Sequence, residues 1–114
     1  MALKEEAQQF LHDFKQKAKV FGIVYYPRKI NLEALLELGI TSEMRTEYIM
    51  NLTIADYYKG PTKDENPNRA EFYEFGLTVN GQEVYLKLSL GNFNKSPHCM
   101  SFHPSKHPIK YPLK

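Results

Sequence analysis

Side chains that could do chemistry gather around one dipeptide in the second half of the sequence. An Asn-Gly pair at residues 80–81 favours a two-residue turn, and alternating apolar runs flank it over residues 71–90. If this pair forms the turn, Glu74 lies opposite Lys87, and Tyr85 lies opposite a glycine that leaves space beneath its ring. The predicted hairpin therefore places a carboxylate, a phenol and an ammonium group on the face away from the core.

A further strand predicted over residues 98–103 could add Ser101 and His103 to the same face. A sheet that carries Glu, Tyr, Lys and His side chains has the groups that metal-free RNA cleavage needs. That reaction requires a base for the 2′-hydroxyl, cations for the phosphorane charge, and an acid for the departing 5′-oxygen. The residue types therefore indicate RNA cleavage with no metal ion or other cofactor.

Each candidate residue has a functional and a structural interpretation. Glu74 is the candidate general base, or else it forms a surface ion pair with Lys87. His103 is the candidate general acid, because histidine ordinarily titrates near neutral pH, or else it ends a strand and meets solvent. Lys59 and Lys87 would hold the scissile phosphate, although Lys59 could instead interact with a helix C-terminus. Tyr85 would stack on a base or hydrogen-bond a phosphate, or else lie at the edge of the core.

Charge is distributed unevenly along the chain. Residues 1–83 hold all 13 acidic residues and 10 of the Lys and Arg residues, whereas residues 84–114 hold five lysines and no acid. A basic segment of this kind suits a polyanionic partner, or it is a solubilising tail. Arg69 in a polar loop, together with Lys106 and Lys110 near the C-terminus, are the candidate RNA-binding residues.

Cys99 is the single cysteine of the chain, which excludes an internal disulfide and a multi-cysteine zinc site. Cys99 and His103 are predicted on one strand face, and His107 follows in the tail. These three side chains have no paired-cysteine motif, so no metal site is predicted. A nucleophilic role for Cys99 is equally weak, because nothing in the sequence marks an oxyanion hole.

The order of elements indicates an α+β fold, with helices first and antiparallel strands after them. Helical segments are expected at residues 3–19, from Asn31 to Gly39, from Thr41 or Ser42 to about Leu52, and in a turn at 53–56 that ends at 59–61. A short β-prone run is expected at 21–26 and a polar loop at 59–70. Residues 1–103 are predicted to form a single domain, and residues 104–114 a basic, proline-rich, extended tail.

Composition places the chain among ordinary globular proteins of one domain, with 114 residues, 42% hydrophobic and 25% charged. No apolar run approaches the roughly 20 residues of a membrane span. The N-terminus is too polar for a signal peptide, so the expected compartment is the cytoplasm.

Three blocks of the sequence resemble the MqsR family of type II toxins, which are small RelE-like messenger-RNA interferases. The blocks are Ile49-x-x-Leu52-Thr53-x-x-Asp56-Tyr57-Tyr58-Lys59, Val84-Tyr85-Leu86-Lys87-Leu88 and Met100-Ser101-Phe102-His103. The resemblance covers roughly residues 30–103. It implies helices packed on a curved antiparallel sheet, sequence-selective and metal-independent endonucleolytic cleavage of mRNA, and neutralisation by a cognate antitoxin. Whether the ribosome is a further partner stays open.

The resemblance also assigns residues. Lys59 falls on the lysine of the family's aromatic-Tyr-Lys block and Tyr85 on the tyrosine of its VYLK strand, and both are family active-site positions. Glu74 lies near a family glutamine, and His103 stands where the family often has a lysine. These two departures would give a more conventional acid–base pair, or a different mode of cleavage.

Two other functions stay open from the sequence alone. The same basic sheet could bind RNA or a protein without performing any chemistry. The chain could also be a small interaction protein with no nucleic-acid role, whose tail is a linker or a docking peptide.

Overall fold

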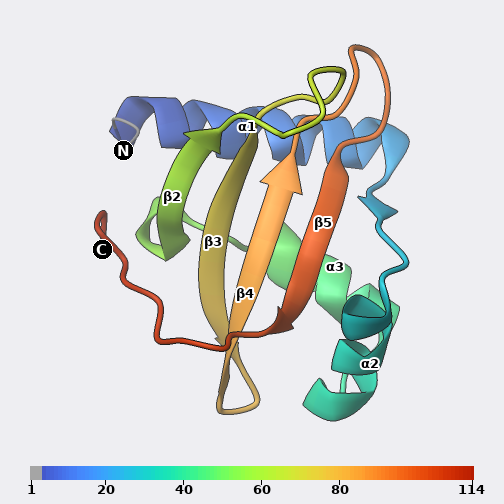
Figure 1. The fold of residues 1–114 in the computed structure, drawn as a ribbon, viewed down its shortest axis with the longest axis vertical. Coiled ribbons are helices and arrows are strands. Elements are labelled where there is room, and N and C mark those ends of the chain that lie inside the picture. The colour runs from blue at the N-terminus through green and yellow to red at the C-terminus, as the bar shows by residue number, and fades with distance from the viewer. Residues whose placement is uncertain (1–3) are drawn as a thin grey trace.

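The computed structural model describes residues 4–114 and shows an α+β fold, with helices and a five-stranded mixed sheet (Figure 1). The helical elements are α1 (Lys4–Phe21), α2 (Lys29–Leu38), α3 (Ser42–Met50) and the 3-10 turn η1 (Ile54–Asp56). The strands are β1 (Val24–Tyr25), β2 (Tyr57–Thr62), β3 (Phe72–Val79), β4 (Gln82–Ser89) and β5 (His98–Pro104).

The strands lie in the order β1-β5-β4-β3-β2. All neighbours are antiparallel except β1 and β5, which are parallel. The expectation of a wholly antiparallel sheet is therefore wrong at one edge. Strand β1 lies between α1 and α2 in the chain. The long connection through α2, α3 and strands β2 to β4 brings β5 back beside it in the same direction.

Helix α1 covers one face of the sheet and lies behind the strands in Figure 1. Its buried residues Ala7, Phe10, Leu11 and Phe14 recur at helical spacing, as predicted. They join the core formed by the inward face of the strands, which includes Phe75, Leu86, Leu88 and Phe102. The helix continues to Phe21, beyond the predicted end, and its predicted first residue lies outside the described residues. Among the helices of residues 4–114, none has the length and apolar composition needed to cross a membrane.

The termini of the short helices follow local sequence signals. Gly39 ends α2 in the left-handed conformation with φ of 71°, as predicted. Thr41 caps α3, and its hydroxyl oxygen accepts a hydrogen bond from the backbone N–H of Met44 at 3.1 Å. Thr53 and Asp56 form the predicted capping box of η1.

Asn31 is not the predicted N-cap, because α2 begins at Lys29 and Asn31 lies inside the helix. Its side chain is buried and bonds to β5 instead. The amide nitrogen donates to the carbonyl oxygens of Tyr26 and Met100 at 3.1 and 3.0 Å, and the amide oxygen accepts from the Phe102 N–H at 3.1 Å. Tertiary hydrogen bonds therefore replace the local capping bond that the sequence suggested.

The predicted β3–β4 hairpin is confirmed residue by residue. Val79 pairs with Gln82 across the turn at residues 80–81, and the register continues to Glu74 opposite Lys87. The apolar positions of both strands face α1 and the core. The opposite side of the sheet, named the open face here, carries the polar positions of the hairpin.

Residues 57–62 do not end a helix, as the sequence suggested, but form the edge strand β2. Pro61 lacks an N–H and favours a non-strand conformation, but an edge strand tolerates it because one side needs no ladder bonds. Strand β2 pairs with β3, and Lys59 lies opposite Glu74. The polar loop that was predicted from residue 59 therefore begins only at residue 63.

Strand β5 contains a bulge that corrects another prediction. Lys87 pairs with Ser101, whereas the next residue of β4 pairs with Cys99, so one extra residue lies between these pairs. Cys99 therefore turns into the core, where it is 1% exposed, and His103 lies on the open face opposite Tyr85. The two side chains do not share a strand face.

Candidate active site on the open face

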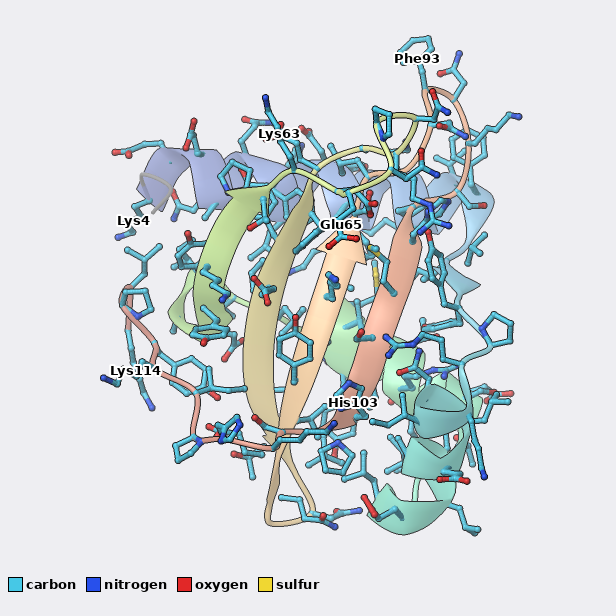
Figure 2. All side chains as sticks on the ribbon, viewed as in Figure 1. Lys4, Lys63, Glu65, Phe93, His103 and Lys114 are labelled. Atoms are coloured by element: carbon cyan, nitrogen blue, oxygen red, sulfur yellow. The ribbon has the colours of Figure 1, made fainter. Side chains whose placement is uncertain are left out.

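Four adjacent strands each contribute one predicted site residue to a single cavity of about 300 Å³ on the open face. The four are Lys59 from β2, Glu74 from β3, Tyr85 from β4 and His103 from β5. Figure 2 shows His103 at the lower end of β5, where the chain turns into the C-terminal tail. The sheet register thus brings together residues that are 44 positions apart at most in the sequence.

Glu74 lies at the centre of this arrangement and is only 7% exposed. The Tyr85 hydroxyl donates a hydrogen bond to Glu74 Oε1 at 2.5 Å, and Lys59 Nζ lies 4.0 Å from Glu74 Oε2. A buried carboxylate needs such partners, because desolvation penalises its charge. The surface ion pair between Glu74 and Lys87 is not what the structure shows, since Lys59 takes that place.

Lys87 lies on the open face as predicted, but its ammonium group sits 4.1 Å from the centroid of the Phe72 ring. It lines a neighbouring cavity of about 460 Å³, which Arg28 and Arg69 also line. The strand register places the backbones of Glu74 and Lys87 opposite each other. The long lysine side chain nevertheless places its ammonium group over the Phe72 ring rather than beside Glu74. Lys87 is therefore placed to contact a ligand beside the Glu74 cavity.

Burial and the hydrogen bond to Glu74 both raise the pKa of Tyr85 well above its ordinary value. The phenol therefore keeps its proton and acts as a donor, which fixes the direction of the Glu74 carboxylate. The Tyr85 ring also lies 5.6 Å from the His103 ring, centroid to centroid.

His103 is 9% exposed and does not simply meet solvent at a strand end. Its Nδ1 lies 3.0 Å from the carbonyl oxygen of Pro104. A carbonyl can only accept, so Nδ1 carries the hydrogen. Nε2 is then the ring nitrogen available to a ligand, as an acceptor when the ring is neutral and as a donor when it is charged.

The chain after β5 crosses the lower ends of β4 and β3 (Figure 1). Its residues 105–109 line the Glu74 cavity. The Ile109 N–H and the Tyr111 hydroxyl donate to the two carboxylate oxygens of Glu83, at 2.9 and 2.8 Å. A Cβ at Gly76 would lie 2.6 Å from Ile109 Cδ1 and 2.7 Å from the Tyr111 hydroxyl. The space predicted at Gly76 is thus filled by the tail, with Ile109 buried.

The predicted RNA-binding residues are distributed along this face. Lys106 lines the Glu74 cavity, together with His107. Arg69 lines the neighbouring 460 Å³ cavity. Lys110 is exposed in the tail, next to the buried Ile109.

Arg28 is the site residue that sequence reasoning missed. It lines both the Glu74 cavity and its neighbour, and its Nη1 donates to the Ser101 hydroxyl at 3.2 Å. No local pattern distinguishes an arginine between Pro27 and a helix, so only the sheet contact reveals it. With Arg28 included, the face presents several cations around one buried carboxylate.

Nowhere in the part of the chain that the structure describes do three or more His, Cys, Asp or Glu side chains form a group that could hold a metal ion. Burial raises the pKa of the Cys99 thiol to about 12, so it is neither a thiolate ligand nor a nucleophile near neutral pH.

No protein-family model, no curated protein and no solved structure matches this chain.

Proposed function

We propose that the chain is a metal-independent endoribonuclease of RelE-like fold, the toxin of a type II toxin–antitoxin pair, acting on mRNA. The observation that carries the proposal is the meeting of Lys59, Glu74 and His103 around one cavity. A buried carboxylate, a cation and a histidine with a free ring nitrogen match the three needs of 2′-hydroxyl attack. Binding to mRNA and to a cognate antitoxin, with or without the ribosome, follows from the family resemblance.

The reaction proceeds by internal transfer at one phosphate. Glu74 accepts the proton of the 2′-hydroxyl while the 2′-oxygen forms a bond to phosphorus. The bond between phosphorus and the 5′-oxygen breaks, and charged His103 donates its Nε2 proton to that oxygen. The products are a 2′,3′-cyclic phosphate and a 5′-hydroxyl, and water can open the cyclic product to a 3′-phosphate.

Lys59 and Arg28 stabilise the charge that develops on the phosphorane oxygens, because both line the same cavity as Glu74. Tyr85 does not compete for the role of base, since its pKa is raised. Its hydrogen bond instead holds one carboxylate oxygen of Glu74 and leaves the other oriented toward Lys59 and the cavity.

A second candidate is an RNA-binding module that performs no chemistry. The observation that favours it is that both Glu74 oxygens already have protein partners, a phenol and an ammonium group. In that case Glu74 is a structural anion, and the cations around it bind the RNA backbone.

Cleavage of a defined mRNA in EDTA, with and without ribosomes, separates the two functions. The variants are Glu74→Gln and His103→Ala, with Glu71→Gln and His12→Ala as controls, since Glu71 and His12 are exposed. The nuclease predicts discrete cuts that both site variants lose and both controls keep, with RNA affinity retained in Glu74→Gln. Binding without any cuts by the wild type would support the second candidate. Cuts that survive in both site variants would refute the assigned roles.

A further inference from the structure

The groove on the open face does not end at the Glu74 cavity. Arg28 is shared between that cavity and the neighbouring 460 Å³ cavity. Tyr26, Asp64, Arg69 and Met100 are in turn shared between the 460 Å³ cavity and a third cavity of about 270 Å³. The three cavities therefore adjoin one another along β5, from His103 near its lower end to His98 at its start, and are together named the groove here.

The third cavity is built around an aromatic pair. The Tyr26 hydroxyl lies 3.0 Å from His98 Nδ1, and the two ring centroids are 5.5 Å apart. The Arg69 guanidinium carbon lies 5.7 Å from the centroid of the Tyr26 ring. A planar phenol, a planar imidazole and a planar guanidinium group thus line one concave space, none of them used in the proposed reaction.

One wall of this cavity is the connection between β4 and β5, and it is held firmly. Lys17 from α1 donates to the carbonyl oxygens of Leu90 and Asn92 at 2.6 and 2.8 Å. A Cβ at Gly91 would lie 2.6 Å from the Ser96 carbonyl oxygen and 3.2 Å from the His98 ring. Only a glycine allows this close approach, which sets the wall directly against the histidine.

Another wall is the loop between β2 and β3, which supplies Asp64, Asn68 and Arg69 to the cavity. Figure 2 labels Lys63 and Glu65 of the same loop near the upper end of the sheet. Two side chains stabilise this loop. Asp64 Oδ1 accepts from the Asn66 N–H, and Asn66 Oδ1 accepts from the Asn68 N–H, both at 2.9 Å. The Arg69 N–H donates to the Asn66 carbonyl oxygen at 3.0 Å, so the turn presents Arg69 to the cavity.

We propose that the cavity around Tyr26, Arg69 and His98 binds one nucleobase of a single-stranded RNA whose phosphate occupies the Glu74 cavity. The inference rests on the proposed function and adds a base-recognition site to it. Stacking between a base and the Tyr26 or Arg69 plane supplies affinity, and the polar groups around the rim hydrogen-bond the base edge.

The charges of the two ends of the groove favour a base over a second phosphate here. The Glu74 cavity is lined by three cations, Arg28, Lys59 and Lys106, against the single carboxylate of Glu74, so its excess positive charge suits an anion. The third cavity is lined by one cation, Arg69, and one carboxylate, Asp64, together with asparagine and serine side chains. Its charges balance, and such a mixture of donors and acceptors fits the edge of a neutral base better than a phosphate.

The state of His98 agrees with this assignment. Burial lowers the pKa of His98, and the nearby positive charges of Lys17 and Arg69 lower it further. The imidazole is therefore neutral at pH 7. A neutral ring offers a hydrogen bond and a stacking surface to a neutral base, and lacks the positive charge that would attract a phosphate.

Binding is tested with a five-nucleotide DNA, which lacks the 2′-hydroxyl and cannot be cleaved, followed through the histidine ring signals by NMR. We expect the His98 signals to shift on titration. Arg69→Ala and Tyr26→Ala should each weaken binding about tenfold, as the loss of one stacking partner does. Tyr26→Phe keeps the ring and should retain most affinity, which guards against a folding defect in Tyr26→Ala. Lys19→Ala, which removes an exposed cation of α1 that lines none of these three cavities, is the matched control.

Cutting of a randomised RNA by the wild type and by Arg69→Ala supplies a second readout. We expect the wild type to prefer one base near the cut and the variant to lose that preference while still cutting. Shifts at His103 without shifts at His98 would overturn the base site and leave the nuclease standing. Shifts at His98 with no cutting would keep the base site and reject the nuclease. Shifts at neither histidine would overturn the base site as well.

Discussion

At the scale of single residues, the site depends on how one buried carboxylate is held. Glu74 is almost inaccessible, and its only charge-assisted hydrogen bond among the described contacts comes from Tyr85, at 2.5 Å. Hydrogen bonds to charged groups contribute about 1.5–3 kcal/mol each. The phenol is therefore a positioning group whose removal should affect the reaction more than the binding of RNA.

The first prediction concerns Tyr85→Phe. This change removes the hydroxyl and keeps the ring, so the Glu74 carboxylate loses its fixed orientation. We expect kcat for RNA cleavage to fall about 10- to 100-fold, with KM nearly unchanged, because orientation matters most in the transition state. Steady-state cleavage at saturating RNA measures both constants. Tyr48→Phe, in α3 and outside this cavity, serves as the control. An unchanged kcat would show that the hydrogen bond to Glu74 has no part in the reaction.

The second prediction distinguishes the two lysines that the sequence treated alike. Lys59 lies beside Glu74, whereas Lys87 lies over Phe72 in the neighbouring cavity. Lys59→Met should therefore lower kcat, and Lys87→Met should mainly raise KM. If Lys87 contacts a phosphate, its loss should also reduce the slope of log affinity against log salt by about 0.7. Equal effects of both changes on kcat would contradict the separate roles.

At the scale of elements, the C-terminal segment is bound to the hairpin by Glu83 and by its contact with Gly76. A methyl group at residue 76 would collide with Ile109 and Tyr111. The segment and the sheet therefore build the Glu74 cavity together, so the position of one depends on the other.

The third prediction follows from that contact. Gly76→Ala should displace the tail and reduce the free energy of unfolding by about 1–3 kcal/mol, the usual cost of overpacking. Urea denaturation measures the loss, and cleavage should fall in parallel because Lys106 and His107 leave the cavity wall. Thr78→Ala, at an exposed position of the same strand, should change little. A fully stable and active Gly76→Ala protein would mean that the tail does not depend on this contact.

The elements also show how far local sequence signals reach. Asn80-Gly81 determined the hairpin register, and this alone placed Glu74 and Tyr85 on one face. The bulge in β5 has no local sequence signature, so the predicted orientation of Cys99 was wrong. The edge strand that carries Lys59 was not predicted, because its Pro61 is unfavourable in most strands. The ion pair of Glu74, the role of Arg28 and the fold of the tail depend on contacts between distant segments, which no local pattern encodes.

At the scale of the whole molecule, the uneven charge and the groove agree. Residues 84–114 contain five lysines and no acidic residue. The tail that carries several of them is folded against the open face, where it adds Lys106 to the Glu74 cavity. The uneven distribution of charge along the sequence thus corresponds to an uneven distribution in space, with positive charge concentrated where the proposed RNA strand lies.

The last prediction concerns the stability of the whole fold at alkaline pH. Burial raises the pKa of Cys99 from 9.0 to about 12, and burial likewise raises the pKa values of Tyr25 and Tyr85. When the pKa of an acid is higher in the folded protein than in the unfolded chain, the full stabilisation is present at pH values below the unfolded-state pKa. It is lost as the pH rises from the unfolded-state pKa toward the folded-state pKa. The free energy of unfolding should therefore be constant to about pH 8 and fall from about pH 9 to 12.

Cys99→Ala measures how much the thiol contributes to this decrease in the free energy of unfolding. Urea unfolding at pH 8 and pH 10.5 should show the wild type losing about 2 kcal/mol more than the variant, because each pKa unit corresponds to about 1.4 kcal/mol. The tyrosines remain in both proteins, so their contribution cancels in the comparison. A thiol reagent should also label Cys99 at pH 8 only as the protein unfolds, since the native thiol is buried and protonated. Rapid native labelling, or an equal loss of stability in both proteins, would show that the bulge does not hold Cys99 in the core.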